Sequence, residues 1–380
     1  MDVSQRRLLD VLATPDARFV IPLYQRTYSW GHDQCEELWL DILRAARYER
    51  NHFCGTILYL EATGKDAPAS GGVNLLEIID GQQRIMTVSL LIVALARFLD
   101  EKDMMCNGRD GAALRRELLT IEVHGKQETK LVPSQPDRTV YLNAVLGDSP
   151  FGDKRASGEL ATEAAVAPGV ASRVLANISF FATRMEEDGF DPDELMQGLE
   201  RLLVIMARVD DARAAQPIFE SINSKGMPLN VADMVRNYLL LSEERAEQAR
   251  MYREYWQAIQ GMFAPDPGSL RLDTAIKSWL AIRLKGARIR SPEQVYSSFK
   301  RFVEDHYRGA KEPILRELRG FSLMWAESYR YHGVKKYKSG SDWAELGAPA
   351  LTSGYKLKKP DNEEYAARVR EELRAIDEKW

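Results

Sequence analysis

The residues best suited to chemistry are five consecutive ones, Asp-Gly-Gln-Gln-Arg at residues 80–84, which stand between two apolar runs. The run before them is typical of a strand, and the run from Ile85 to Ala96 is typical of a buried helix. A strand that ends in Asp-Gly and opens a helix presents free backbone N–H groups at one point. The helix dipole adds partial positive charge there and Arg84 adds a full one, so this block suits a phosphate-bearing ligand.

The same block also admits a purely structural interpretation. Asp-Gly is a common turn pair, Asp80 could cap the helix, and Arg84 could be a surface residue of the first turn. The five residues by themselves leave both interpretations open.

Two further blocks place polar residues among apolar ones. The first is Ile-Pro-Leu-Tyr-Gln-Arg-Thr-Tyr-Ser-Trp at residues 21–30. The second is Phe-Glu-Ser-Ile-Asn-Ser-Lys-Gly-Met-Pro-Leu at residues 219–229. In the second block Gly226 suits a helix C-cap, but Asn223 and Lys225 have no such structural explanation.

In this order, the three blocks resemble the N-terminal domains of a large bacterial family. This family includes GmrSD-like type IV restriction enzymes, related phage-exclusion nucleases and the factor that senses phosphorothioated DNA. Smaller similarities at residues 53–57, and at residues 130–134 with Asp137, agree with this assignment. The resemblance covers roughly residues 15 to 240, and the combined motifs are more specific than any one of them.

The resemblance implies a variant of the ParB/sulfiredoxin fold, with the Asp-Gly-Gln-Gln-Arg block in the place of ParB's nucleotide motif. The predicted fold class is α+β, with a small mixed sheet and helices followed by a mainly helical domain. The predicted domains are a ParB-like α/β nucleotide-binding domain at 1–105, a helical part of the same module at 106–245 and a helical C-terminal extension at 246–380.

The resemblance also implies a nucleotide-phosphate site at the block, with residues 21–30 as a second wall of the same pocket. The catalytic residues that it implies are Asp80, Gln83 and Arg84. Asp80 would also bind Mg²⁺ or position water. The nucleotide- and phosphate-binding residues that it implies are Gly81, Gln82, Arg84, Arg26, Gln25, Asn223 and Lys225. The pocket that it implies for modified DNA consists of Tyr24, Gln25, Arg26, Tyr28 and Trp30.

Structural alternatives stay open for these residues. Gln82 and Gln83 could be structural amides, and Tyr24 could be a partly buried aromatic residue flanked by a polar pair. In the functional interpretation, Arg26 clamps a phosphate bidentately, and the aromatic residues of its block stack on a base.

Composition bounds the class of protein. The 380-residue chain has a net charge of −4, so any contact with DNA must come from a local patch. Its three cysteines form no C-x-x-C pair, which indicates reduced thiols. No signal peptide is visible at the start, and the longest near-apolar run, Ile85 to Ala96, is too short to span a bilayer. We therefore expect a cytoplasmic protein with no membrane partner.

Hydrophobic periodicity predicts the elements that position these blocks. Strands are predicted at 18–21, 53–60 and 73–79, with the last two paired. Helices are predicted at 4–12, 33–48 with Asp33 as its N-cap, and 82–99. Later helices are predicted at 112–120, 172–187, 191–207, 212–222 and 231–241, the last capped by Asn230. We expect Trp256, Trp279 and Trp325 to anchor the C-terminal core.

The predicted function is that of an NTPase and DNA-sensing module of an anti-phage restriction protein. It would use a nucleoside triphosphate and Mg²⁺ to control recognition or cleavage of modified DNA, phosphorothioated DNA included. The family usually continues into an HNH-type nuclease domain, and none of the five histidines here is set in such a context. We therefore expect that nuclease, as a C-terminal domain or as a partner, to lie outside this chain.

Two alternatives to this function stay open. The first is a non-hydrolysing sensor of modified DNA that activates a separate nuclease, and the second is a chain that is itself a nuclease. The sequence leaves the preferred nucleotide, the DNA modification and the oligomeric state undecided, a homo-oligomer included.

Overall fold

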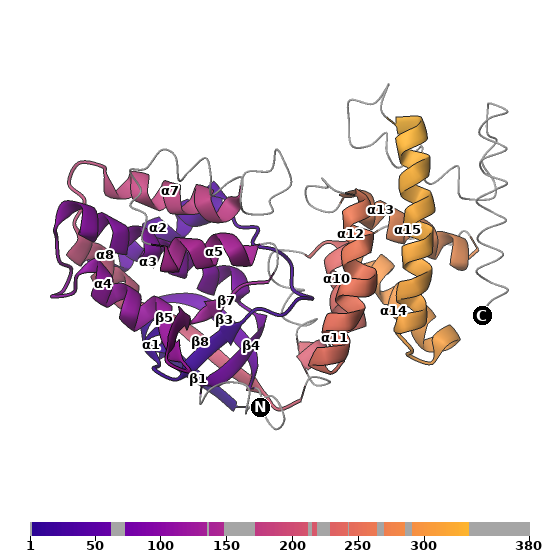
Figure 1. Cartoon of the computed structure of the whole chain (residues 1–380), viewed down its shortest axis with the longest axis horizontal. Coiled ribbons are helices and arrows are strands. Elements are labelled where there is room, and N and C mark those ends of the chain that lie inside the picture. Colours follow the sequence, from indigo (N-terminus) through magenta and orange to yellow (C-terminus); the bar gives the residue numbers. More distant parts are fainter. Residues whose placement is uncertain are drawn as a thin grey trace. The chain divides into compact units, whose positions relative to one another are not determined.

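Apolar runs from distant parts of the chain pair into a six-stranded mixed sheet in the order β1-β8-β3-β4-β2-β7 (Figure 1). The computed structural model describes residues 2–61, 73–134, 137–147, 172–211, 215–218, 229–241, 243–263, 270–285 and 291–333. The chain divides into two units, Met1–Glu220 and Ser221–Trp380, and the sheet belongs to the first. The strands of the sheet are β1 (Asp2–Arg7), β2 (Ala17–Val20), β3 (His52–Glu61), β4 (Asn74–Asp80), β7 (Leu131–Val132) and β8 (Leu202–Val209).

Strand β4 lies inside the sheet, antiparallel to β3 and parallel to β2. On the other side of β3, strand β8 runs parallel to it and antiparallel to β1. The register of β3 shifts between Leu58 and Tyr59, next to the pairing of Leu58 with Asp80. Irregularities of this kind are common beside functional sites, because they re-aim the side chains near them.

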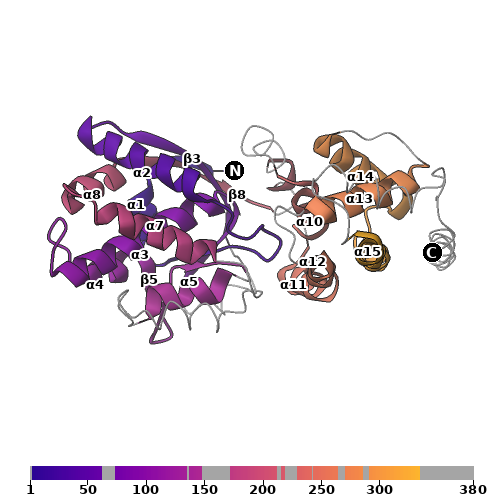
Figure 2. The ribbon, with the colours of Figure 1, turned by 90° about the horizontal axis from the view of Figure 1, so that it is seen from above.

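The helices of the first unit cover this sheet. They are α1 (Leu8–Ala13), α2 (His32–Arg47), α3 (Gln82–Lys102), α4 (Gly111–Leu114), the π-helix η3 (Arg115–Leu119), α5 (Asp137–Leu146), α7 (Arg173–Met185) and α8 (Pro192–Glu200). Figures 1 and 2 show α2, α3, α5 and α7 gathered on one face of the sheet. Between Gln82 and Ala96 every residue of α3 is buried except Arg84. A helix that is apolar on all sides belongs in a core, so α3 anchors the site to the interior.

Several predicted elements of the first unit are confirmed. Strands β2, β3 and β4 and helices α2 and α3 lie where the periodicity placed them, and β3 pairs with β4. The predicted N-cap of α2 is wrong: Gly31 is the N-cap, and its backbone N–H donates to Gln34 Oε1 at 2.8 Å. Asp33 lies inside the first turn instead, where its charge still favours the helix N-terminus.

Two predicted helices are wrong in part. Residues 4–12 split into the exposed strand β1 and the short helix α1. Residues 191–207 split into helix α8 and strand β8, which pairs along β3. A continuous apolar run fits either a strand or a buried helix, so pairing with a distant strand decided the outcome. The hairpin of β5 (Thr120–Val123) and β6 (Lys126–Thr129) was not predicted; its turn places His124 and Gly125 at positive φ.

The sheet is built from segments on both sides of residue 105. The segment 1–105 supplies four of the six strands, and β7 and β8 come from later residues. The predicted α+β class, with a mixed sheet and helices, is confirmed.

The described part of the second unit is helical. Its elements are α10 (Val231–Leu240), α11 (Arg245–Met251), the π-helix η4 (Tyr252–Trp256), α12 (Gln257–Phe263), α13 (Leu270–Arg283), α14 (Pro292–Tyr307) and α15 (Glu312–Gly333). Trp256, Trp279 and Trp325 are fully buried, so their predicted role as core anchors is confirmed. Asn230 caps α10 as predicted, since its Oδ1 accepts from the Asp233 N–H at 2.7 Å.

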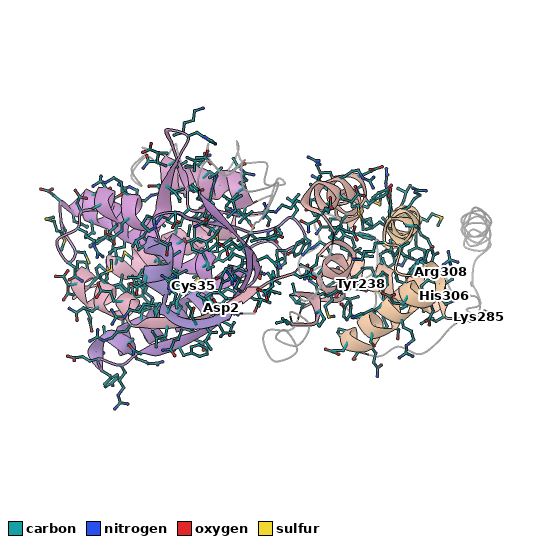
Figure 3. All side chains as sticks on the ribbon, turned by 90° about the horizontal axis from the view of Figure 1, so that it is seen from below. Asp2, Cys35, Tyr238, Lys285, His306 and Arg308 are labelled. Atoms are coloured by element: carbon teal, nitrogen blue, oxygen red, sulfur yellow. The ribbon has the colours of Figure 1, made fainter. Side chains whose placement is uncertain are left out.

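All three cysteines are free thiols, as predicted, and Figure 3 labels Cys35, which is buried in the first unit. Of the helices in the part of the chain that the structure describes, none combines the length and the apolar character needed to cross a membrane.

Candidate functional site

The Asp-Gly-Gln-Gln-Arg block lies where β4 ends and α3 begins. Gly81 is the N-cap of α3 with φ = 93°, a backbone conformation that favours glycine. A Cβ atom at this position would lie 3.0 Å from the Thr56 carbonyl oxygen and 3.0 Å from Ile57 Cγ1, both on β3. No side chain caps α3, and its first turn carries no acidic residue. The N–H groups that open the helix therefore face no competing carboxylate from their own turn.

Arg84 is held against strand β3 by two contacts. Its Nη1 donates to the Thr56 carbonyl oxygen at 3.0 Å. Its guanidinium group also lies against Gly55, where a Cβ atom would be 2.7 Å from Nη2 and where φ is +106°. Burial lowers the pKa of Arg84, while the nearby charge of Asp80 raises it. Because Gly55 has no side chain, it leaves the space that the Arg84 guanidinium group occupies.

Asp80 sits within electrostatic reach of two arginines. Burial raises the pKa of its carboxyl group, and three effects oppose this rise: a hydrogen bond from the Gly81 N–H and the charges of Arg84 and Arg26. The structure therefore brings one carboxylate and two guanidinium groups together at the start of α3. Such a group has a net positive charge, which suits an anionic ligand.

The described side chains offer few ligands for the predicted Mg²⁺ ion. Among the residues that the structure describes, no group of three or more His, Cys, Asp or Glu side chains could hold a metal ion. Asp80 offers one carboxylate, and two cations lie near it. Mg²⁺ binds in many enzymes through one or two carboxylates and the phosphates of the substrate. The donor set at this site fits Mg²⁺ only in that form, with phosphate oxygens as further ligands.

Gln25 and Gln82 form a relay of hydrogen bonds inside the fold. Gln25 Nε2 donates to the Ile79 carbonyl oxygen at 2.6 Å, and Gln82 Nε2 donates to Gln25 Oε1 at 3.0 Å. The two side chains are 3% and 5% exposed. Their amide N–H groups are therefore directed inward, while a phosphate oxygen needs a donor. Gln82 Oε1 is buried and has no hydrogen-bond partner among the described residues.

Gln83 ties the 21–30 block to α3. Its Oε1 accepts from the backbone N–H groups of Ser29 at 2.8 Å and Trp30 at 3.2 Å, and its Nε2 donates to the Thr27 carbonyl oxygen at 3.3 Å. Both the oxygen and the nitrogen of this amide bind the backbone of residues 27–30, so the contacts of Gln83 hold this loop in position against α3. Its predicted catalytic role stays a prediction.

The aromatic residues of the 21–30 block lie mostly inside the fold. Tyr24 is fully buried, and its hydroxyl donates to Glu77 Oε1 at 3.3 Å. The Tyr28 hydroxyl lies 2.7 Å from Thr87 Oγ1 and accepts from Asn177 Nδ2 at 2.8 Å. Burial raises the pKa of Tyr28 far above its usual range, so this hydroxyl stays neutral. Of the three aromatic residues proposed for DNA sensing, Trp30 alone keeps part of its surface exposed.

A small pocket with about 10 Å³ of free space, room for about one water molecule, lies beside the block. Arg26, Tyr28, Gln82, Gln83, Ser134 and Asp137 are the polar residues that line it. Asp137 Oδ2 accepts from the Tyr28 backbone N–H at 2.7 Å, and burial raises the pKa of this carboxyl group to about 6. No role for Ser134 or Asp137 followed from the sequence, although both belong to the similarity that begins at residue 130. Asn177 on α7 donates to the Tyr28 hydroxyl and to the Trp30 carbonyl oxygen, and no sequence pattern predicted this role.

Two of the predicted residues lie outside the described part of the chain. Asn223 and Lys225 fall in the segment 219–228, outside the described residues.

A larger cleft of about 580 Å³ lies in another part of the first unit. Its charged lining residues are Arg97, Arg115, Arg116, Asp100 and Glu101. Arg97 follows Gln82 by fifteen positions on α3, which is about 22 Å along a helix axis. This cleft is therefore separate from the pocket beside the 80–84 block.

Fold and site together define an α+β protein with a cationic helix start at the end of a central strand. Comparison with protein families matches residues 8–240 to the GmrSD restriction endonuclease, N-terminal domain. The match covers more than half of the chain, so the protein belongs to this family, and the resemblance drawn from the three blocks is confirmed. Membership places the chain among phage-defence restriction proteins and implies DNA binding and an associated nuclease domain. No curated protein matched the chain in a sequence comparison.

Proposed function

We propose that the first unit is a ParB/sulfiredoxin-like NTPase that controls how a restriction nuclease recognises or cleaves modified DNA. The observation that carries the proposal is the arrangement at the start of α3, where an uncapped helix N-terminus lies beside Arg84 and Arg26. A helix N-terminus with two guanidinium groups is suited to the phosphates of a nucleotide.

In this proposal each residue of the cluster has a separate task. Arg84 and Arg26 neutralise the charge that develops on the transferred phosphoryl group. Asp80 would hold Mg²⁺, and the bound ion would supply further neutralisation of charge. Gln83 keeps residues 27–30, and with them Arg26, in place against α3.

The test is phosphate release from ATP, GTP, CTP and UTP in the presence of Mg²⁺, for the wild type and for Arg84→Ala. We expect turnover in the wild type and a loss on the order of 10²–10³ in kcat for the variant. Each reaction is run without DNA, with plain DNA and with phosphorothioated DNA. Stimulation by one of the DNAs would identify the signal that the module reads.

Arg97→Ala is the matched control. Arg97 lies on the same helix, is also half-buried, and also donates to a backbone carbonyl, that of Ala144 at 2.6 Å. Burial lowers the pKa of both arginines. The two variants therefore lose comparable packing, and Arg97→Ala should keep its turnover. Turnover lost in Arg97→Ala and kept in Arg84→Ala would move the nucleotide to the larger cleft.

A second candidate function is a sensor of modified DNA that does not hydrolyse nucleotide. The size of the pocket favours it, because its free space of about 10 Å³ has room for about one water molecule and not for a nucleotide. Tight binding of modified DNA without nucleotide, together with no phosphate release, would support the sensor and exclude the NTPase.

A further inference from the structure

The orientation of the Gln25–Gln82 relay is fixed by its first member. The Ile79 carbonyl oxygen can only accept, so Gln25 must present its Nε2 there and turn its Oε1 toward Gln82. Gln82 must then present its own Nε2 to Gln25 Oε1. As a result, the remaining atom of this amide, Gln82 Oε1, is an acceptor and cannot be exchanged for a donor.

This acceptor is buried and lacks a hydrogen-bond partner among the described residues, and Gln82 lines the small pocket. An unsatisfied buried acceptor costs stability unless a ligand or a water molecule donates to it. The pocket therefore calls for a group with at least one N–H or O–H bond beside Gln82.

Asp137 supplies a second acceptor in the same pocket. Its Oδ2 is engaged by the Tyr28 backbone N–H at 2.7 Å, and no described residue donates to Oδ1, so Oδ1 can accept from a molecule in the pocket. The only other charged side chain in the described lining is Arg26, from the loop after β2. Tyr28 is the other titratable lining residue, and burial keeps it neutral.

Two acceptors and one cation around a small space suit a water molecule next to an anion. A water molecule can donate one proton to Gln82 Oε1 and the other to Asp137, while its oxygen points away from both. Arg26 shares the pocket and also acts electrostatically on Asp80. The pocket thus borders the cluster to which the proposed function assigns the phosphates.

We propose that Asp137 and Gln82 hold the water that attacks the nucleotide, with Asp137 as the general base; this inference rests on the proposed NTPase function. The water oxygen forms a bond to the γ-phosphorus, and the bond from that phosphorus to the β–γ bridging oxygen breaks. The bridging oxygen keeps the electron pair and leaves with the nucleoside diphosphate. The water proton passes to Asp137, and inorganic phosphate is the second product. A base with a pKa near the working pH is efficient in this step.

The variant that isolates this role is Asp137→Asn. An asparagine keeps an oxygen acceptor for the Tyr28 N–H, so the loop contact survives, but it can no longer take a proton. We expect kcat for NTP hydrolysis to fall on the order of 10²–10⁴-fold, with KM changed by less than about threefold. In the wild type kcat should rise with pH through the pKa of Asp137, and this acidic limb should be absent from any residual activity of the variant.

Asp110→Asn is the matched control. Like Asp137, Asp110 stands at the start of a helix and accepts a hydrogen bond from a backbone N–H, in this case from Ala113 to Oδ1 at 2.6 Å. It should keep the wild-type kcat and pH profile. Melting curves of both variants show whether each is folded at the assay temperature.

The outcomes separate the inference from the proposed function. Wild-type turnover that survives unchanged in Asp137→Asn overturns the inference and leaves the NTPase standing. A wild type without turnover for any nucleotide, with or without DNA, overturns both. If Asp137→Asn proves unfolded, Asp137→Glu replaces it. Glutamate retains a base, so this variant should keep measurable turnover and the acidic limb of the pH profile. Loss of that limb would refute the role of Asp137 as general base.

Discussion

The same substitution, Asp137→Asn, should make the protein more stable at neutral pH while it removes activity. Burial raises the pKa of Asp137 to about 6 from the ordinary 3.8 expected in the unfolded chain. Between these two pH values the folded protein binds more protons than the unfolded chain, so the free energy of unfolding falls as pH rises. Above pH 6 the folded protein carries the full cost of a charged, poorly solvated carboxylate.

The size of this cost follows from the difference in pKa. A difference of about two pH units corresponds to about 3 kcal/mol of lost stability at neutral pH. Asparagine has no charge to desolvate and keeps the acceptor for the Tyr28 N–H. The variant should therefore gain up to about 3 kcal/mol above pH 6, and the gain should vanish below about pH 4.

Urea unfolding followed by circular dichroism measures this difference at about pH 4 and about pH 8, for wild type, Asp137→Asn and the Asp110→Asn control. The reasoning requires a gain that grows with pH in the first variant and no such trend in the control. A variant that is less stable than wild type at the higher pH would refute it. That result would mean that Arg26 stabilises the Asp137 charge more than burial penalises it.

Three further predictions test how the site and the second unit are held. Gly55→Ala should lower stability by about 1–2 kcal/mol, because φ is positive there; urea unfolding gives this cost. The new Cβ also displaces the Arg84 guanidinium, so phosphate release should fall toward that of Arg84→Ala. Gln83→Met should free residues 27–30, seen as faster amide hydrogen exchange there than in α8. In the second unit, Glu317→Ala should cost about 3–5 kcal/mol, because it removes the buried partner of Arg283; equal urea midpoints for variant and wild type would disprove this.

The sequence was sufficient to place the candidate site between a strand and a helix, because the residues proposed for it lie in short, contiguous blocks. A polar interruption between two apolar runs predicted the end of β4, the start of α3 and the cation at Arg84. The structure brings the 21–30 block to the same place, through the bond from Gln82 to Gln25 and the contacts of Gln83. The order of the three blocks also identified the family.

The roles of individual side chains within the blocks could not be derived in this way. Gln82 and Gln83 look alike in the sequence, yet one ends a relay as a buried acceptor and the other fastens a loop. Asp137 lies more than fifty residues from the block, and only the fold places it beside Gln82. Its raised pKa arises from burial, and burial depends on everything that packs around it.

By itself, the sequence determined the family, the α+β class and the local path of the chain from β4 into α3, because these depend on neighbouring residues. The tertiary structure alone decided that residues 202–209 form a strand, since an apolar run becomes β8 only when β3 offers its edge. It also decided which polar residues line the pocket. Hydrogen bonds between residues more than fifty positions apart depend on three-dimensional proximity, which no local pattern of residues encodes.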